Sequence, residues 1–169
     1  INMQSVSGGN KVSCVKPQKV GNPEGTMVLI DNGAECTGSP FRSDFINYVE
    51  NDGTYGDVAG CVAGAKGAKI AGVGDIPIIL EVTDPNSGRV DYIETLIVGA
   101  FHAPDLKSRI VHENEVLMKL NFYTENKHCV TPDNVPYFVH RVSKRILYLY
   151  RESHSVLNYA KIMFLPDLQ

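Results

Sequence analysis

The sequence lacks several features that would assign it at once to a common class of protein. No apolar run approaches the roughly 20 residues that a membrane-spanning helix requires, so we expect a soluble protein. The motifs Gly-x-Ser-x-Gly, His-Glu-x-x-His and Gly-x-Gly-x-x-Gly do not occur, which argues against the active sites and the dinucleotide-binding turn that they mark. Positive charge is not in excess, because 16 Lys and Arg stand against 19 Asp and Glu. With a net charge of -3, direct binding of nucleic acid or of a membrane surface is not expected.

Cysteine and histidine are few and scattered. The four cysteines and five histidines show none of the spacings that are typical of a zinc or other metal site. No Asn-x-Ser/Thr sequon occurs in the chain, so nothing marks the cysteines as the disulfides of a secreted domain. We therefore expect reduced thiols in a cytoplasmic compartment, and no bound metal.

What the sequence does contain is enough apolar material for one domain built from strands. Hydrophobic residues make up 43% of the 169 residues and charged residues 21%, values near those of globular proteins. Apolar runs bounded by turn formers predict strands over 75–82 and 90–98, separated by a turn over 84–88. One short helix is predicted over 110–120, with Ser108 as its N-cap. Many short strands and one helix predict an all-β barrel or sandwich.

Turn-rich stretches divide the chain into three parts. Residues 1–25 are rich in Ser, Gly, Asn, Lys and Pro and predict a flexible leader or an edge strand, whereas 26–150 form the predicted folded domain. Residues 151–169 have no clear periodicity and are interpreted as a tail. Within the domain, seven glycines between 53 and 74 predict a mobile hairpin. Further short strands are predicted over 122–130, 137–142 and 145–150.

An acidic residue, Asp31, ends the first strongly apolar run. The residues before it, Met27 to Ile30, have the continuous apolar pattern of a buried strand, and Asn32-Gly33-Ala34 follows it. Asn-Gly is a strong signal for a type I′ hairpin turn, so Asp31 can be a simple turn former. An acid at the end of a buried strand can also be a functional group held by a rigid scaffold. The residues alone leave both interpretations open.

The segment from Met27 to Glu35 resembles the active-site segment of the retropepsins of copia-type LTR retrotransposons, in which Asp-Ser-Gly-Ala or Asp-Thr-Gly-Ala follows an apolar strand. Later segments resemble other parts of that family in the same order: the strand after the flap (68–78), the segment before the helix (98–107), the terminal helix and following strand (109–122) and the Leu-Tyr-x-Leu that opens the pre-integrase region (144–149). This resemblance implies a retropepsin-like closed β-barrel with one short C-terminal helix and an active site formed at a homodimer interface. The resemblance also implies that the tail over 151–169 is the start of a pre-integrase region.

The same resemblance implies roles for individual residues. Asp31 is the expected catalytic acid, and Asn32, Gly33 and Ala34 form the expected active-site loop. Glu35 and Arg109 are expected to bind substrate. The expected flap over the substrate consists of Val62, Ala63, Gly64, Ala65, Lys66 and Gly67.

An aspartic protease of this kind needs two carboxylates, whereas the Asp-x-Gly triplet occurs once in the chain. The resemblance therefore implies a symmetric homodimer in which two copies of Asp31 share a proton. One copy would activate a water as a base while the other donates a hydrogen bond to the developing oxyanion. Such an enzyme needs no metal or cofactor. Its implied substrate is a Gag-Pol-type polyprotein, cleaved in the cytoplasm or within virus-like particles.

One position departs from the family pattern. The residue after the catalytic Asp is Ser or Thr in the family, and its hydroxyl bonds across the dimer axis, whereas this chain has Asn32. The larger amide supports an alternative, in which the chain is a catalytically inactive or domesticated retropepsin-fold module for dimerisation or peptide binding. A third interpretation is an unrelated small β-barrel in which Asp31 only makes a turn.

Overall fold

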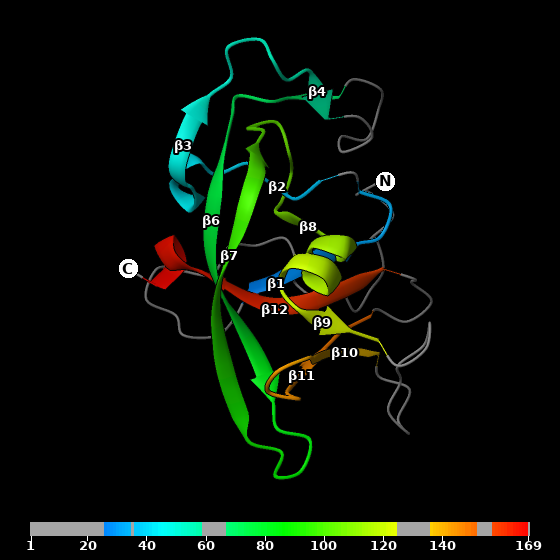
Figure 1. Cartoon of the computed structure of the whole chain (residues 1–169). Coiled ribbons are helices and arrows are strands. Elements are labelled where there is room, and N and C mark those ends of the chain that lie inside the picture. The colour runs from blue at the N-terminus through cyan, green and yellow to red at the C-terminus, as the bar shows by residue number, and fades with distance from the viewer. Residues whose placement is uncertain (1–25, 35, 59–66, 125–135, 152–156, 169) are drawn as a thin grey trace.

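Strands dominate the architecture in a computed structural model that describes residues 26–34, 36–58, 67–124, 136–151 and 157–168 (Figure 1). The strands of the main sheet are β1 (Thr26–Asp31), β2 (Gly38–Ser39), β3 (Ile46–Glu50), β6 (Gly72–Thr83), β7 (Val90–His102), β8 (Ile110–His112), β9 (Phe122–Tyr123), β10 (Tyr137–His140), β11 (Ile146–Tyr148) and β12 (Asn158–Phe164). Two more strands, β4 (Asp57–Val58) and β5 (Ala68–Lys69), pair with each other. Three short helical turns complete the described part: η2 (Arg42–Asp44), η3 (Glu115–Lys119) and η4 (Leu165–Leu168).

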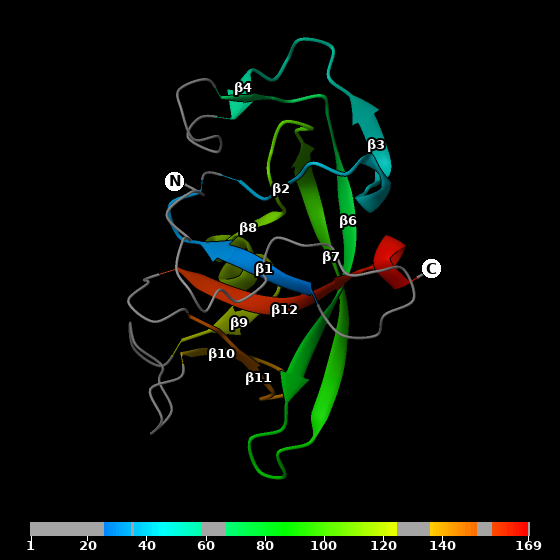
Figure 2. The same cartoon turned by 180° about the vertical axis from the view of Figure 1, so that it is seen from behind.

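Six of the strands close into a barrel. Each strand in the order β12, β1, β8, β2, β7, β6 pairs with the next, and β6 pairs back onto β12. Strand β1 lies antiparallel to β12 and parallel to β8, so β1 has a neighbour on both sides. Seen from behind, β1 and β12 cross the middle of the molecule side by side (Figure 2). The predicted all-β fold with a closed barrel is confirmed at this level.

The longest feature of the barrel is the antiparallel hairpin of β6 and β7, which runs the height of the molecule in Figure 1. Buried and half-buried side chains alternate along all of β6, because successive side chains of a strand point to opposite faces. In the turn that joins the strands, the Gly88 N–H donates to the Asp84 carbonyl at 2.8 Å. Gly88 has a φ of 71°, a conformation that favours glycine. The strands predicted over 75–82 and 90–98 are confirmed, and both extend further.

The main core fills the barrel and continues under the strands that extend it. Beyond β6, the sheet continues through β11, β10 and β9. Side chains of these added strands belong to the same buried cluster as those of the barrel strands. The largest fully buried side chains are Phe122, Phe164, Ile76, Ile78, Leu80, Ile97, Leu147, Leu149, Ile162, Val28, Val82 and Val111.

The helix predicted over 110–120 is wrong in its first part. Residues Ile110–His112 form β8, which is inserted between β1 and β2, and the helical turn η3 covers only Glu115–Lys119. Ile110 and Val111 are β-branched and buried, which suits a strand enclosed by two neighbours. The predicted cap Ser108 therefore precedes a strand, and Asn114 precedes η3.

The sequence suggested that residues 151–169 form a tail outside the domain, but their described part belongs to the domain. Strand β12 pairs with β1 over five residues and with β6 over three, so it is part of the barrel wall. Its Ala160 and Ile162 side chains are fully buried. The folded domain therefore includes β12. Of the other predicted strands, 137–142 and 145–150 are confirmed in shorter form as β10 and β11, and 122–130 is described only at its start, as β9.

The predicted hairpin between 53 and 74 is present at its base. Strands β4 and β5 pair antiparallel, Asp57 with Lys69 and Val58 with Ala68. Residues 59–66, which include the expected tip, lie outside the described residues. Among the residues that are described, no helix is long and apolar enough to cross a membrane.

Candidate active site

Asp31 is the last residue of β1, one residue beyond the part of the strand that pairs with β12. The apolar run before it is buried, because β1 lies between β12 and β8. Asp31 pairs in register with His112 at the end of β8. The loops that leave these two parallel strands therefore start side by side. The next strand in the chain, β2, pairs with β7 and β8 and not with β1, so Asn32-Gly33 does not form the hairpin turn that the sequence left open.

The Asp31 carboxylate is buried at the end of β1, although Asn32 and Gly33 in the turn that follows are exposed. Its side chain is 3% exposed, and the Gly33 N–H donates to Oδ1 at 2.8 Å. This bond closes a local turn of the kind that Asp side chains form with the backbone two residues on. The other oxygen, Oδ2, is buried and has no hydrogen-bond partner among the described residues. A buried carboxylate oxygen without a donor is unfavourable, so the described part of one chain leaves Oδ2 unsatisfied.

The loop after Asp31 is tied to β8 and to the hairpin of β4 and β5. The Thr37 hydroxyl accepts a hydrogen bond from the His112 N–H at 3.1 Å. Ala34 packs against a small buried cluster that includes Ala68 of β5. These contacts fix the loop between the strand that carries Asp31 and the base of the expected flap.

A second acid, Glu113, lies close enough to Asp31 to interact with it electrostatically. Burial raises the pKa of the Glu113 carboxyl, His112 lowers it and the negative charge of Asp31 raises it further. The sequence did not single out Glu113, because only the parallel pairing of β1 and β8 brings it near Asp31. The expected helix over this segment also concealed that pairing.

Arg109, which the sequence suggested as a substrate-binding residue, is buried against Asp44. Its Nε and Nη2 atoms each lie 2.7 Å from an oxygen of the Asp44 carboxylate, and its guanidinium carbon lies 4.0 Å from the centre of the Phe164 ring. The Ser39 hydroxyl donates to the same carboxylate. This arrangement ties the segment before β8 to η2 and to β12. Glu35, the other expected substrate-binding residue, lies outside the described residues.

Most of the expected flap cannot be placed. Val62 to Lys66 lie outside the described residues, whereas Gly67 precedes β5. A Cβ atom on Gly67 would lie 2.7 Å from the Val58 carbonyl oxygen. A glycine is therefore required where the two strands of this hairpin approach each other.

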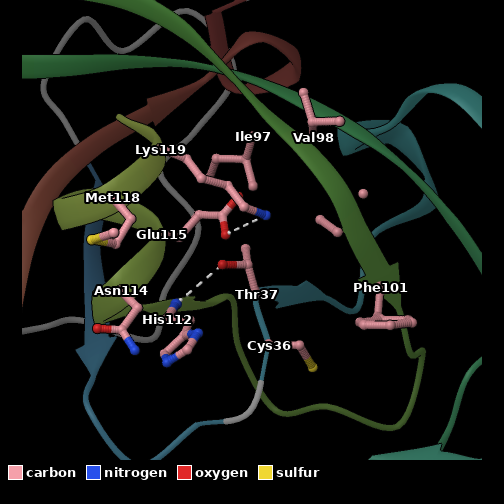
Figure 3. Close-up of a pocket in the computed structure, with 12 residues that line it drawn as sticks. Cys36, Thr37, Ile97, Val98, Phe101, His112, Asn114, Glu115, Met118 and Lys119 are labelled. Carbon is pink, nitrogen blue, oxygen red and sulfur yellow. Dashed lines mark hydrogen bonds and ion pairs between the residues drawn. The ribbon is translucent and has the colours of Figure 1, made fainter. Parts of the chain in front are cut away.

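A cavity of about 320 Å³ opens beside the loop that follows Asp31 (Figure 3). It lies between η3 and β7, and Thr37 and His112 line it. Glu115 and Lys119 point into it from η3. No local sequence pattern indicates this cavity, because its walls come from segments that only the closed barrel brings together.

No family model, curated protein or solved structure matches this chain. Among the residues placed in the structure, no group of three or more His, Cys, Asp and Glu could hold a metal ion.

Proposed function

We propose that the chain is an aspartic endopeptidase that works as a homodimer and cleaves a retrotransposon-type polyprotein. The observation that carries this proposal is the state of the Asp31 carboxylate. The Gly33 N–H donates to one oxygen, and the other is buried without a donor in the described part of the chain. A second carboxyl group that shares a proton with Asp31 would supply the donor that this oxygen lacks.

The second carboxyl group comes from a second copy of the chain. The triplet Asp-x-Gly occurs once in the sequence, so one chain offers one acid of this kind. Across a two-fold axis the same residue meets itself, which makes two copies of Asp31 equivalent. The ionised copy removes a proton from a bound water, and that water attacks the scissile carbonyl carbon. The protonated copy donates a hydrogen bond to the carbonyl oxygen as negative charge develops there.

The substrate is an extended polypeptide that lies between the Asp31 pair and the hairpin of β4 and β5. The contact of Ala34 with the cluster around Ala68 supports this placement, since it puts the base of the hairpin beside the active-site loop. A glycine-rich hairpin has the backbone freedom that a lid over a substrate requires. The resemblance to copia-type retropepsins supports a polyprotein as the natural substrate.

Self-processing of a longer precursor that contains this segment tests the proposal. The precursor is incubated between pH 4 and 7, with and without a statine-type inhibitor, and its fragments are resolved by mass spectrometry. We expect cleavage by the wild type, none by Asp31→Asn and none under inhibitor. Asp105→Asn is the matched control, because Asp105 is exposed and lies on another loop. A precursor that remains intact as a stable dimer would instead support the catalytically inactive module for dimerisation or peptide binding.

A further inference from the structure

The cavity between η3 and β7 contains a buried carboxylate that the proposed function does not use. Glu115 is 8% exposed, and its Oε1 atom is buried with no hydrogen-bond partner among the described residues. Its Oε2 atom lies 3.1 Å from the ammonium nitrogen of Lys119, whose side chain is 62% exposed. An ion pair with so exposed a lysine contributes little and is easily exchanged. The cavity therefore presents a carboxylate with one oxygen that has no donor among the described residues and another that is held by an exposed lysine.

One edge of β7 runs from this cavity without a strand partner. Strand β2 pairs with β7 only at Phe101 and His102, and within the described part of the chain no strand lies beside residues 90–98 on that edge. Within residues 90–98, the Tyr92 N–H donates to the Asp91 side chain at 2.8 Å, so this N–H is already bonded within the chain. An exposed strand edge of this length is a template for an added strand.

The cavity and the edge form one continuous surface. Ile97 and Val98 belong to the unpaired edge and also line the cavity. Val98 is 56% exposed, and Met118, on the helical side of the cavity, is 78% exposed. These apolar side chains suit the methylene stem of a long side chain whose polar end reaches Glu115.

We propose that a basic segment of another protein adds as an extended strand to residues 90–98 of β7 and inserts an arginine side chain into the cavity. The guanidinium group donates two parallel hydrogen bonds to the Glu115 carboxylate and displaces Lys119. Arginine fits better than lysine, because its planar fork matches both carboxylate oxygens. The exposed Glu94 on the same edge and the net charge of -3 also favour a basic partner. This site is separate from Asp31 and does not depend on the proposed peptidase activity.

Binding of a labelled peptide tests this site. Fluorescein-labelled Val-Thr-Val-Arg-Val-Thr-Val, with blocked ends, is titrated with the Asp31→Asn chain, so that cleavage cannot affect the signal, and fluorescence anisotropy is measured. We expect saturable binding, which becomes about tenfold weaker or more when norleucine replaces the arginine or when Glu115→Gln is introduced. A peptide with alternate backbone amides N-methylated should lose binding, because it cannot pair with β7. Glu50→Gln, at an exposed acid of β3, should bind as the parent does.

Circular dichroism shows whether Glu115→Gln folds normally. A second variant tests the site independently if it does not. Val98→Lys adds a positive charge at an exposed position on the rim of the cavity, so it should fold normally and weaken binding of the arginine peptide. The proposal is overturned if the peptide does not bind, or if the norleucine peptide binds as well. It is equally overturned if sedimentation shows that a second copy of the chain occupies the edge and excludes the peptide.

Discussion

Asp44 and Arg109 form a buried ion pair that joins segments far apart in the sequence. The Arg109 side chain is 6% exposed and the Asp44 side chain 0%. We expect Arg109→Met to lower the free energy of unfolding by about 3–5 kcal/mol, because it leaves the Asp44 charge buried without its partner. Urea unfolding followed by circular dichroism measures this loss.

Arg145 provides the matched control for that substitution. It pairs with Asp84 at 2.7 Å, but its side chain is 25% exposed. We expect Arg145→Met to lower the free energy of unfolding by about 0–1 kcal/mol, as is usual for pairs that water screens. Equal losses in the two variants would contradict the view that Arg109 stabilises the fold through its buried pair.

His102 should make stability depend on pH. Burial lowers the pKa of its imidazole, the backbone at Pro40 opposes this, and Arg42 lowers the pKa again. Below about pH 6.5 the unfolded chain then binds a proton that the folded chain does not. The free energy of unfolding should therefore fall as the pH decreases from 6.5 toward the lowered pKa of the folded state.

The variant His102→Gln isolates this contribution. We expect its free energy of unfolding to change less between pH 7.5 and 5.5 than that of the wild type. Burial also lowers the pKa of His140, but both proteins contain that residue, so its effect cancels in the comparison. Parallel pH curves for the two proteins would show that His102 is not responsible.

Among the structural elements, β3 and β6 approach most closely at Gly72. A Cβ atom there would lie 2.3 Å from the Tyr48 ring and 2.6 Å from the Val49 carbonyl oxygen. We expect Gly72→Ala to lower the free energy of unfolding by about 1–3 kcal/mol, because the backbone must move apart. Thermal unfolding measures the change. Gly56→Ala, where nothing lies within 4 Å of the added atom, should change stability by about 0.5 kcal/mol or less, and an equal loss there would refute the steric explanation.

Strand β12 should be essential to the barrel. Ile162 is fully buried and pairs with Leu80 of β6, so Ile162→Ala should lower the free energy of unfolding by about 2–5 kcal/mol. Leu165, just beyond the strand, is 40% exposed, and Leu165→Ala should have a much smaller effect. Chemical unfolding of both variants checks this. A loss after Ile162→Ala as small as that after Leu165→Ala would contradict this role of the β12 side chains.

The sequence could predict β6 and β7 because each is an apolar run bounded by turn formers, which is a local signal. It could not predict β12, since Tyr159, Ala160 and the run Ile162–Phe164 are buried without a regular alternation. A central strand of this kind is recognised only from its neighbours. It also could not separate β8 from η3, because the apolar residues of both together mimic the spacing of one helix.

Some residues of the candidate site could be predicted from the sequence, and others could not. Asp31 stands out because it directly follows a buried apolar run, which is a local signal. Glu113 and Glu115 gave no such signal, since they become relevant only through the pairing of β8 with β1 and the approach of η3 to β7. Residues that depend on contacts between distant segments need the closed barrel to be identified.

In the whole molecule, the proposed active site needs two copies of the closed barrel. The barrel closes through β12 and fixes Asp31 at the end of a central strand. Its Oδ2 atom has no hydrogen-bond partner among the described residues, and the proposed second copy of the chain would supply one. Because two coupled carboxyl groups titrate as a unit, activity should follow a bell-shaped dependence on pH.

The rate of peptide hydrolysis per chain, measured over a dilution series, tests whether two copies of Asp31 form one active site. If two copies of Asp31 form the site, the rate per chain falls on dilution, and added Asp31→Asn chains lower the wild-type rate by forming inactive mixed dimers. A rate per chain that stays constant on dilution, and that the Asp31→Asn chain leaves unchanged, would contradict the shared active site.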